Sequence, residues 1–233
     1  MFFLNKQAAK KQKENPSPDP AKAQSADLEE IKKKLKQTGI DSNHYGLLFS
    51  AIKNKKEETE KSLRGMWFSR SVRKQFRQGN YSPAETFFCR QLTKRPIKAA
   101  HGAYYLGNIK FIELQIDRAK GFYQKAAELY PKNPIFLNEA GMTNHLLGRT
   151  QNAVEYFQQA LAVIKKGSRK LNNPQGAATL NNLSVAYKTL GNLQQAKECA
   201  SQTYEIYVKI FGEDHPGTIK AKKYMDSFNN INN

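Results

Sequence analysis

A small alanine recurs four times through the last two thirds of the chain, each time after a turn signal. The four residues are Ala84, Ala119, Ala153 and Ala196, and the successive sequence steps between them are 35, 34 and 43. A period of about 34 residues is typical of stacked pairs of helices, because one pair alone cannot bury its apolar face. The sequence therefore predicts an all-α fold, a stack of helical hairpins.

Each repeat is expected to contain two helices joined by a short turn. The expected hairpins are 65–78 with 82–94, 98–113 with 116–129, 135–147 with 150–165 and 175–190 with 193–211, and a last helix, 216–228, is expected to cap the stack. Gly79, Gly148 and Gly191 fall at the turns, where glycine adopts the left-handed backbone that ends a helix. Leu114 takes this position in the second unit, so we predict that its turn is built differently.

An aromatic residue follows the alanine by four positions in the first three units, as Phe88, Tyr123 and Phe157. Residues four apart lie on one face of a helix. We expect the alanine to let the two helices of a pair approach closely. We expect the aromatic ring to fill the gap between successive pairs.

The segment before the repeats, 1–64, differs from them in pattern. Residues 1–25 hold nothing that can form a core, so this polar tail is predicted to be disordered. Residues 26–64 are predicted to form an N-terminal helical segment, with one helix starting near Asp27 and a second over 42–64. In the second helix, apolar residues near Leu48 are expected to lean on the first repeat, and the charged remainder is expected to face solvent.

Positive charge is concentrated where the repeats begin. The formal net charge is +18, and residues 65–98 hold eight basic residues and one acidic residue. Arg70, Arg73 and Arg77 are spaced so that they form one stripe along a helix. Because arginine pairs well with carboxylate and phosphate, this stripe is either an anion-binding entry to a groove or an exposed basic helix face.

Several function classes find no support in the sequence. There is no run of about 18 apolar residues, so no membrane span is predicted. None of the four histidines has a partner at a metal-ligand spacing. Because no phosphate-binding loop, nucleophile elbow or HExxH motif is present, we expect no cofactor, no metal and no enzymatic activity.

The two cysteines, Cys89 and Cys199, lie far apart in the sequence at core-like positions in predicted helices. This favours buried small hydrophobic residues over a disulfide or a metal site. It also favours a reducing compartment such as the cytoplasm. The basic run Lys32–Lys34 is either a nuclear address or a solvated helix face.

The repeated pattern resembles the tetratricopeptide repeat. The pattern consists of the turn glycines, the alanines, the aromatic residues and the closing prolines Pro96 and Pro131. The resemblance covers about 65–210. It implies a right-handed superhelical stack of helical hairpins (an α-solenoid), with a domain over 65–229 that has four repeats and a C-terminal cap helix.

The later repeats resemble the longer kinesin-light-chain variety. The segment Ala178–Ser184 opens a unit, and Gly212–Pro216 forms a linker to the next helix. The spacing from Pro174 to Pro216 equals the period of that variety. The similarity concerns the style of the repeat and does not imply work with a motor protein.

The resemblance also implies a concave groove, lined by the first helix of each pair, that holds an extended peptide or a partner helix. Carried over unit by unit, the groove residues are Arg70, Arg73, Arg77, Tyr104, Asn108, Phe111, Asn138, Met142, His145, Asn181, Val185 and Lys188. Asn138 and Asn181 occupy equivalent positions, where an amide can bond a peptide backbone or, alternatively, a neighbouring helix. The carboxylate clamp of the family is matched only by scattered residues, so that activity is not predicted.

The sequence favours a non-catalytic adaptor or scaffold that binds a protein segment, expected to be acidic, in a basic groove. Association with nucleic acid is the alternative, because the charge favours it although no nucleic-acid motif is present. The sequence leaves open whether the N-terminal helices occupy the groove themselves.

Overall fold

The computed structural model describes residues 31–34, 36–37, 40, 45–64, 69–167 and 173–228. The predicted tail 1–25, the predicted helix start at Asp27 and the chain end after 228 lie outside the described residues. Every regular element in the described part of the chain is a helix.

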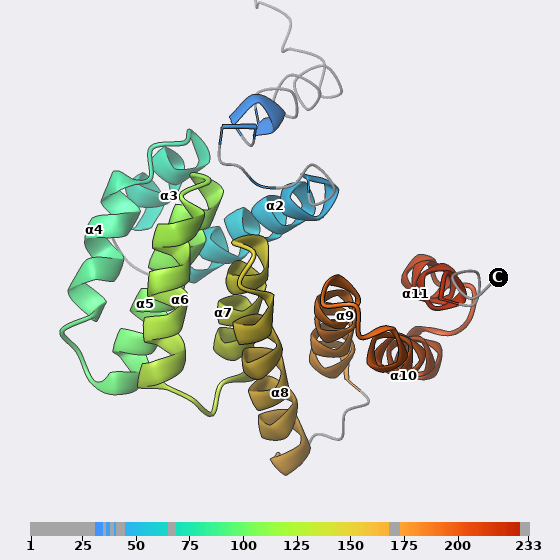
Figure 1. Ribbon diagram of the computed structural model, residues 1–233. Helices are drawn as coiled ribbons and strands as arrows, with labels where there is room; N and C mark the ends of the chain where they lie inside the picture. Colours follow the sequence, from blue (N-terminus) through green and yellow to red (C-terminus); the bar gives the residue numbers. More distant parts are fainter. Residues whose placement is uncertain are drawn as a thin grey trace, which may run out of the picture.

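The helices follow one another as antiparallel hairpins that lie side by side (Figure 1). In chain order they are α2 (Tyr45–Ser62), α3 (Ser69–Arg77), α4 (Ser82–Gln91), α5 (Pro96–Ile112), α6 (Ile116–Leu129), α7 (Pro134–Leu146), α8 (Thr150–Lys166), α9 (Pro174–Thr189), α10 (Leu193–Phe211) and α11 (Pro216–Asp226). The hairpins are α3–α4, α5–α6, α7–α8 and α9–α10, and α11 packs against α10. The predicted ranges agree with these bounds to within a few residues, and the expected start of the first helix at 65 lies outside the described residues.

Proline and asparagine set the starts of the inner helices. A proline occupies the first turn of α5, α7, α9 and α11, where its missing N–H leaves no hydrogen bond unmade. Asn133 caps α7 by accepting a hydrogen bond from the backbone N–H of Ile135 at 3.0 Å. Asn173 caps α9 in the same way, because its side-chain oxygen accepts a hydrogen bond from the backbone N–H of Gly176 at 2.9 Å.

The turn inside the hairpin has the same geometry in all four units. Gly79, Gly148 and Gly191 have φ angles of 82°, 73° and 78°, and Leu114 has a φ of 61°. In each turn the next residue donates its backbone N–H to a carbonyl five positions earlier, as Gln115 does at 2.8 Å. The prediction of a different turn at Leu114 is therefore wrong. The leucine adopts the left-handed backbone at an energetic cost, and its buried side chain helps to offset that cost.

The aromatic residue of each central unit packs inside its own hairpin. A Cβ atom added at Gly107 of α5 would stand 2.6 Å from Cε1 of Tyr123 on α6. A Cβ atom added at Gly141 of α7 would likewise stand 2.6 Å from Cε1 of Phe157 on α8. The predicted location of these rings between successive pairs is thus corrected. The ring fills the space that a glycine leaves open on the facing helix of the same pair.

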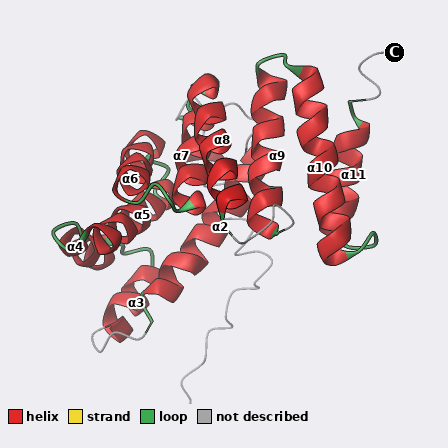
Figure 2. Ribbon diagram, turned by 90° about the horizontal axis from the view of Figure 1, so that it is seen from below, coloured by secondary structure: helices red, strands yellow, loops and turns green. Residues whose placement is uncertain are grey.

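Helix α2 crosses the first helices of the hairpins. Figure 2 shows it running from beside α9 toward α3. Its buried residues Leu48, Ile52, Lys55 and Thr59 recur every three or four positions, so they form one stripe that faces the stack. The expectation that the charged half of this helix faces solvent is wrong for Lys55 and Thr59, which are 4% and 0% exposed.

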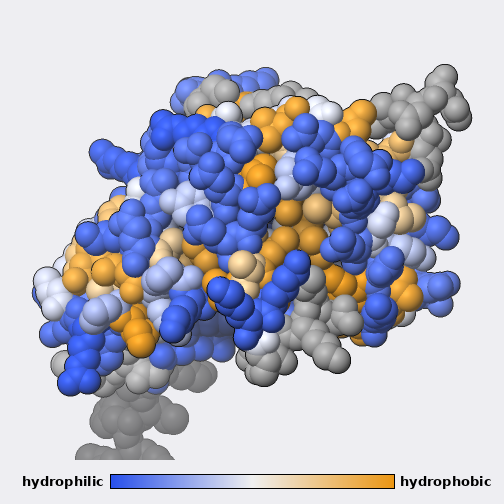
Figure 3. All heavy atoms as spheres, turned by 60° about the horizontal axis from the view of Figure 1, so that its bottom comes forward, coloured by the Kyte–Doolittle hydropathy of each residue, from blue (hydrophilic) through white to orange (hydrophobic). Residues whose placement is uncertain are grey.

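On the face that Figure 3 presents, hydrophilic residues predominate, and hydrophobic atoms lie in several patches between them. The large apolar side chains that are exposed in the described part of the chain are Ile97, Leu190, Leu193, Phe211 and Ile219. None of the described helices is both long and apolar enough to pass through a membrane.

The two cysteines lie in different environments. Cys199 on α10 is 8% exposed, and burial together with the nearby Glu198 carboxylate raises the pKa of its thiol to about 11. Cys89 on α4 is exposed, so the expectation that it is a core residue is wrong. Phe88, the residue before it, points into the core instead.

We expect a thiol reagent such as Ellman's reagent to modify Cys89 rapidly in the folded protein at about pH 8, because an exposed thiol has ordinary reactivity. Cys199 should react only after denaturation. The measurement is the number of thiols released before and after addition of guanidinium. A Cys89→Ser variant that still reacts rapidly without denaturant would contradict this assignment.

Candidate functional site

Lys55 lies at the centre of the contact between α2 and the repeats. Its side chain is 5% exposed, and its ammonium pairs with the carboxylate of Glu139 on α7. Its Nζ atom is also 4.9 Å from the ring centroids of both Phe111 and Tyr123. A carboxylate and two aromatic faces together offset the desolvation of the buried charge. One side chain of α2 therefore contacts three successive helices, α5, α6 and α7.

A polar network extends this contact along α2. Tyr104 donates its hydroxyl to Glu58 at 2.8 Å, and Asn108 donates to the Thr59 hydroxyl at 3.2 Å. The Asn108 side-chain oxygen accepts from the hydroxyl of Tyr123 at 2.8 Å. Burial, reinforced by nearby carboxylates, raises the pKa of both tyrosines. Both phenols therefore remain protonated hydrogen-bond donors at neutral pH.

These contacts change the interpretation of three expected groove residues. Tyr104, Asn108 and Phe111 are 3%, 0% and 0% exposed. They lie on α5, the helix against which α2 packs. They are not open to solvent, because α2 packs over them, although Phe111 also borders the cavity described next.

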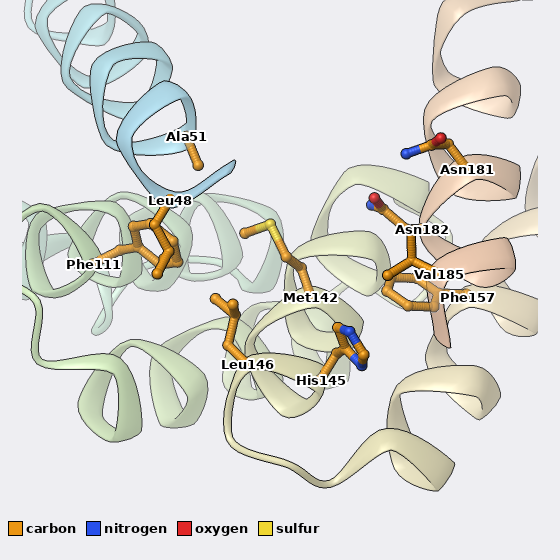
Figure 4. Close-up of a pocket in the computed structure, with 10 residues that line it drawn as sticks. All are labelled: Leu48, Ala51, Phe111, Met142, His145, Leu146, Phe157, Asn181, Asn182 and Val185. Carbon is orange, nitrogen blue, oxygen red and sulfur yellow. The ribbon is translucent and has the colours of Figure 1, made fainter. Parts of the chain in front are cut away.

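A cavity lies beside the N-terminal half of α2. Its lining includes the expected groove residues Phe111, Met142, His145, Asn181 and Val185. Figure 4 shows side chains from α2, α7 and α9 directed toward a shared space. The cavity volume of about 140 Å³ is below the ~300–1,000 Å³ of typical small-molecule sites, and a cavity of ~150 Å³ holds a group the size of benzene. It has room for one apolar side chain.

Sequence reasoning missed the other five residues that line this cavity, Leu48, Ala51, Leu146, Phe157 and Asn182. Leu48 and Ala51 belong to α2, and their apolar stripe was visible in the sequence. The sequence did not show that this stripe packs on the inner side of the stack, because no local pattern predicts where a flanking helix docks.

The two expected backbone-binding asparagines differ in their surroundings. Asn138 accepts a hydrogen bond from Asn182 at 3.1 Å, which is the helix-to-helix bond considered as the alternative. Asn181 lines the cavity and has no hydrogen bond to another side chain in the described part of the chain. Its amide therefore faces the cavity without a partner among the described side chains.

Two other expected groove residues also make contacts within the chain. Lys188 lies over the rings of Tyr224 and Phe228, with 5.6 Å and 5.2 Å from Nζ to the ring centroids. It therefore marks the boundary between α9 and the capping helix. His145 lines the cavity, and its Nδ1 is 3.3 Å from the hydroxyl of Thr150.

The expected arginine stripe lies at the opposite end of α2 from the cavity. Arg77 donates to the carboxylate of Glu60 on α2, with an Nε to Oε1 distance of 2.8 Å. This bond, together with the charges of Arg64 and Arg73, lowers the pKa of Glu60. Ala51 at the cavity and Glu60 at the stripe are ~14 Å apart along the helix axis, since each residue adds ~1.5 Å. The stripe and the cavity are therefore separate sites joined by α2.

No cluster of three or more histidine, cysteine, aspartate or glutamate side chains within the described ranges could hold a metal ion. The site has an apolar cavity and the half-buried amide of Asn181. Such a set can bind and orient a polypeptide.

The repeated antiparallel hairpins, with their inner helices sharing one face, define an α-solenoid. A family model for the tetratricopeptide repeat matches residues 133–209. The tetratricopeptide-repeat match therefore covers α7 to α10, and the same hairpin geometry continues in α3 to α6.

A curated protein matches part of the chain. The chain is 29% identical over 109 residues to the anaphase-promoting complex subunit cut9 of Schizosaccharomyces pombe, a match that covers 46% of this chain and 16% of that protein. It therefore spans about a sixth of the length of this curated relative.

Solved structures of similar fold include the nearly identical repeats of a putative kinesin light chain from Podosopora anserina. The TM-score is 0.56, the sequence identity is 16%, and the match covers 78% of this chain and 86% of that one. A variant of those repeats gives a TM-score of 0.57 with the same identity and coverage. These likenesses confirm the predicted fold class and the similarity of the repeats to the kinesin-light-chain type.

Proposed function

We propose that this protein is a non-catalytic adaptor that captures a segment of a partner protein in the open half of its groove. The observation that carries the proposal is the cavity between α2, α7 and α9, which is lined by apolar side chains and the free amide of Asn181. An apolar side chain of the partner enters the cavity, and Asn181 bonds its backbone.

The size of the cavity supports a peptide over a small molecule, as its volume suits one side chain. Affinity then depends on contacts along the groove as well as on this one anchor. Because α2 occupies the first half of the groove, the bound segment is short and lies along α7 and α9.

We further propose that the partner segment carries negative charge. A net charge of +18 steers an anionic partner toward the protein and speeds the encounter. The free thiols of Cys89 and Cys199 suit a reducing compartment, and we propose the cytoplasm as the place of action.

The proposal is tested by selecting a displayed library of random dodecapeptides on the immobilised full chain. We expect enriched peptides to share an apolar residue and to lose at least tenfold in affinity for a Val185→Glu variant, because a carboxylate cannot be buried unpaired in the cavity. Isothermal titration of the enriched peptides measures this loss.

Leu193→Glu is the matched control, because Leu193 is an exposed apolar residue at the start of the outer helix α10. It should leave peptide affinity unchanged. The proposal fails if no peptide is enriched, or if enriched peptides bind the Val185→Glu and wild-type proteins equally.

A further inference from the structure

Basic side chains gather at one edge of the stack, where each hairpin connects to the next. The turns inside the hairpins lie at one end of the helices, so the connectors between successive hairpins lie at the other end. In Figure 1 the connectors from α4 to α5 and from α6 to α7, and the last turn of α8, lie on the lower side of the molecule. The exposed basic residues of this side, which we call the connector edge, are Arg90, Lys94, Arg95, Lys98, Lys132, Lys165 and Lys166.

The connector edge is strongly cationic, whereas the opposite edge is close to neutral. The described residues of the first three connectors, counted with two residues on each side, hold six of these cations and one carboxylate, that of Glu128. The four hairpin turns, counted in the same way, hold three basic residues, Arg77, Arg149 and Lys188, and two acidic residues, Glu113 and Asp117.

The cations of the connector edge are not neutralised by other side chains. None of the seven forms an ion pair within the described part of the chain. The fourth connector, 212–215, holds Glu213 and Asp214, so the cationic part of the edge ends before α11. The uncompensated charge therefore indicates an anionic partner at this edge.

An apolar side chain is exposed among these cations. Ile97 is 55% exposed, the largest fraction among the exposed large hydrophobic residues of the described chain. It lies in the first turn of α5, next to Lys98 and two positions after Arg95. An apolar residue between cations is favoured at the boundary between lipid headgroups and acyl chains, because the cations can pair with the lipid phosphates around it.

The connector edge is hollowed between the second and third connectors. The hollow has a volume of about 730 Å³, and its lining includes the partly buried Tyr130, Ile135 and Val163 together with Lys132 and Lys166. Its volume is in the range of ~300–1,000 Å³ that is typical of small-molecule sites. Apolar side chains beside two cations suit an anionic headgroup and the start of its acyl chains.

We propose that the connector edge docks on a bilayer surface that contains anionic lipid. The cations pair with the lipid phosphates, and Ile97 enters the boundary of the acyl chains. The stack then stands on the membrane with its hairpin turns directed away from it. This inference does not depend on peptide capture, because the cavity beside α2 shares no residue with the connector edge.

Nucleic acid is also attracted by cations, but the exposed side chains favour lipid. Tyr130 is the aromatic residue of the described connectors, and its ring packs against Phe136 with 6.4 Å between the ring centroids. It is also partly buried, so the connectors present no open ring on which a base could stack. Ile97 offers no hydrogen bond to a phosphate or a base, whereas a bilayer removes it from water.

Flotation of the full chain with lipid vesicles tests the proposal. The vesicles contain phosphatidylcholine alone or phosphatidylcholine with about 30% phosphatidylserine. The wild type is compared with Lys94→Glu/Arg95→Glu/Lys98→Glu at the connector edge and with the control Lys220→Glu/Lys222→Glu/Lys223→Glu on α11. Both variants replace three exposed basic residues, so they change the net charge equally. Circular dichroism verifies that each variant keeps its helical content.

A second pair of variants tests the apolar contact without any change of charge. Ile97→Ser removes the exposed isoleucine of the connector edge. Leu193→Ser is its control, because Leu193 is an exposed apolar residue beside a hairpin turn at the opposite edge.

We expect the wild type to bind the phosphatidylserine vesicles and not those of phosphatidylcholine alone. The partition coefficient should fall at least tenfold with the connector-edge triple variant and less than about threefold with the α11 variant. Ile97→Ser should lower it about threefold or more, and Leu193→Ser should leave it unchanged. Failure to bind the anionic vesicles, equal losses for the two triple variants, or wild-type binding by Ile97→Ser would each overturn the proposal.

A fluorescently labelled random RNA of about 20 nucleotides serves as the competing ligand, with its binding measured by anisotropy at about physiological salt. We expect weak binding that the two triple variants reduce equally. Tight RNA binding that is lost only with the connector-edge variant, in a protein that does not float with vesicles, would assign this edge to nucleic acid instead.

Discussion

Replacing Lys55 with methionine is expected to lower the free energy of unfolding by about 3–5 kcal/mol. Methionine keeps the length of the side chain but leaves the carboxylate of Glu139, which is 15% exposed, without its cation. It also removes the ammonium from the faces of Phe111 and Tyr123. Urea unfolding followed by circular dichroism measures the loss.

The double variant Lys55→Met/Glu139→Leu should recover most of this loss, because replacing a buried ion pair by apolar residues is often neutral. Lys53→Met on the exposed side of the same helix is the control and should change stability by less than about 0.5 kcal/mol. A Lys55→Met protein as stable as the Lys53→Met protein would show that α2 does not pack on the repeats in the way described.

Alanine at Gly107 or Gly141 is expected to be the second most damaging change, at about 1–3 kcal/mol for each site. The new Cβ would stand 2.6 Å from a ring carbon of Tyr123 or Phe157, and both rings are buried. The ring or the two helices of the hairpin must therefore shift, which weakens the contacts of the whole unit.

Gly121 on α6 is the matched control for this pair. It is a helical glycine with nothing within 4 Å of an added Cβ, so Gly121→Ala should stabilise the protein by about 0.5–1 kcal/mol through helix propensity alone. Opposite signs for Gly121→Ala and Gly107→Ala in thermal unfolding would support the packing inside the hairpin. A stabilising Gly107→Ala would contradict it.

Local patterns were enough to predict the hairpins. The alanine spacing and the turn glycines predicted the helix ranges, because both reflect short-range constraints that every unit repeats. The turn at Leu114 was predicted wrongly because a leucine side chain favours a different turn, whereas tertiary packing of the hairpin imposes the left-handed conformation on it. The positions of Tyr123 and Phe157 were predicted wrongly, because the glycines that receive them, Gly107 and Gly141, lie on the opposite helix of the same pair. The position of Phe88 was predicted correctly, since its ring stacks on Tyr105 of the next pair with 4.9 Å between the ring centroids.

The site could be predicted only in part. Met142, Asn181 and Val185 do line the cavity, since their equivalent positions within the repeats put them on the inner helices. The burial of Tyr104 and Asn108 could not be predicted, because it depends on where α2 docks. The charge pattern of α2 predicted a solvated face, yet Lys55 is buried on account of a carboxylate 84 positions away.

Hydrogen–deuterium exchange of the full chain, with and without a peptide from the selection, tests most directly whether α2 fills one half of the groove and a partner fills the other. We expect the amides of α2 to exchange as slowly as those of α5 before any peptide is added, because α2 is already packed. The peptide should then add protection on α7 and α9, around Met142 and Asn181. Fast exchange throughout α2 in the absence of peptide, or protection that appears only on the outer helices α8 and α10, would contradict this account.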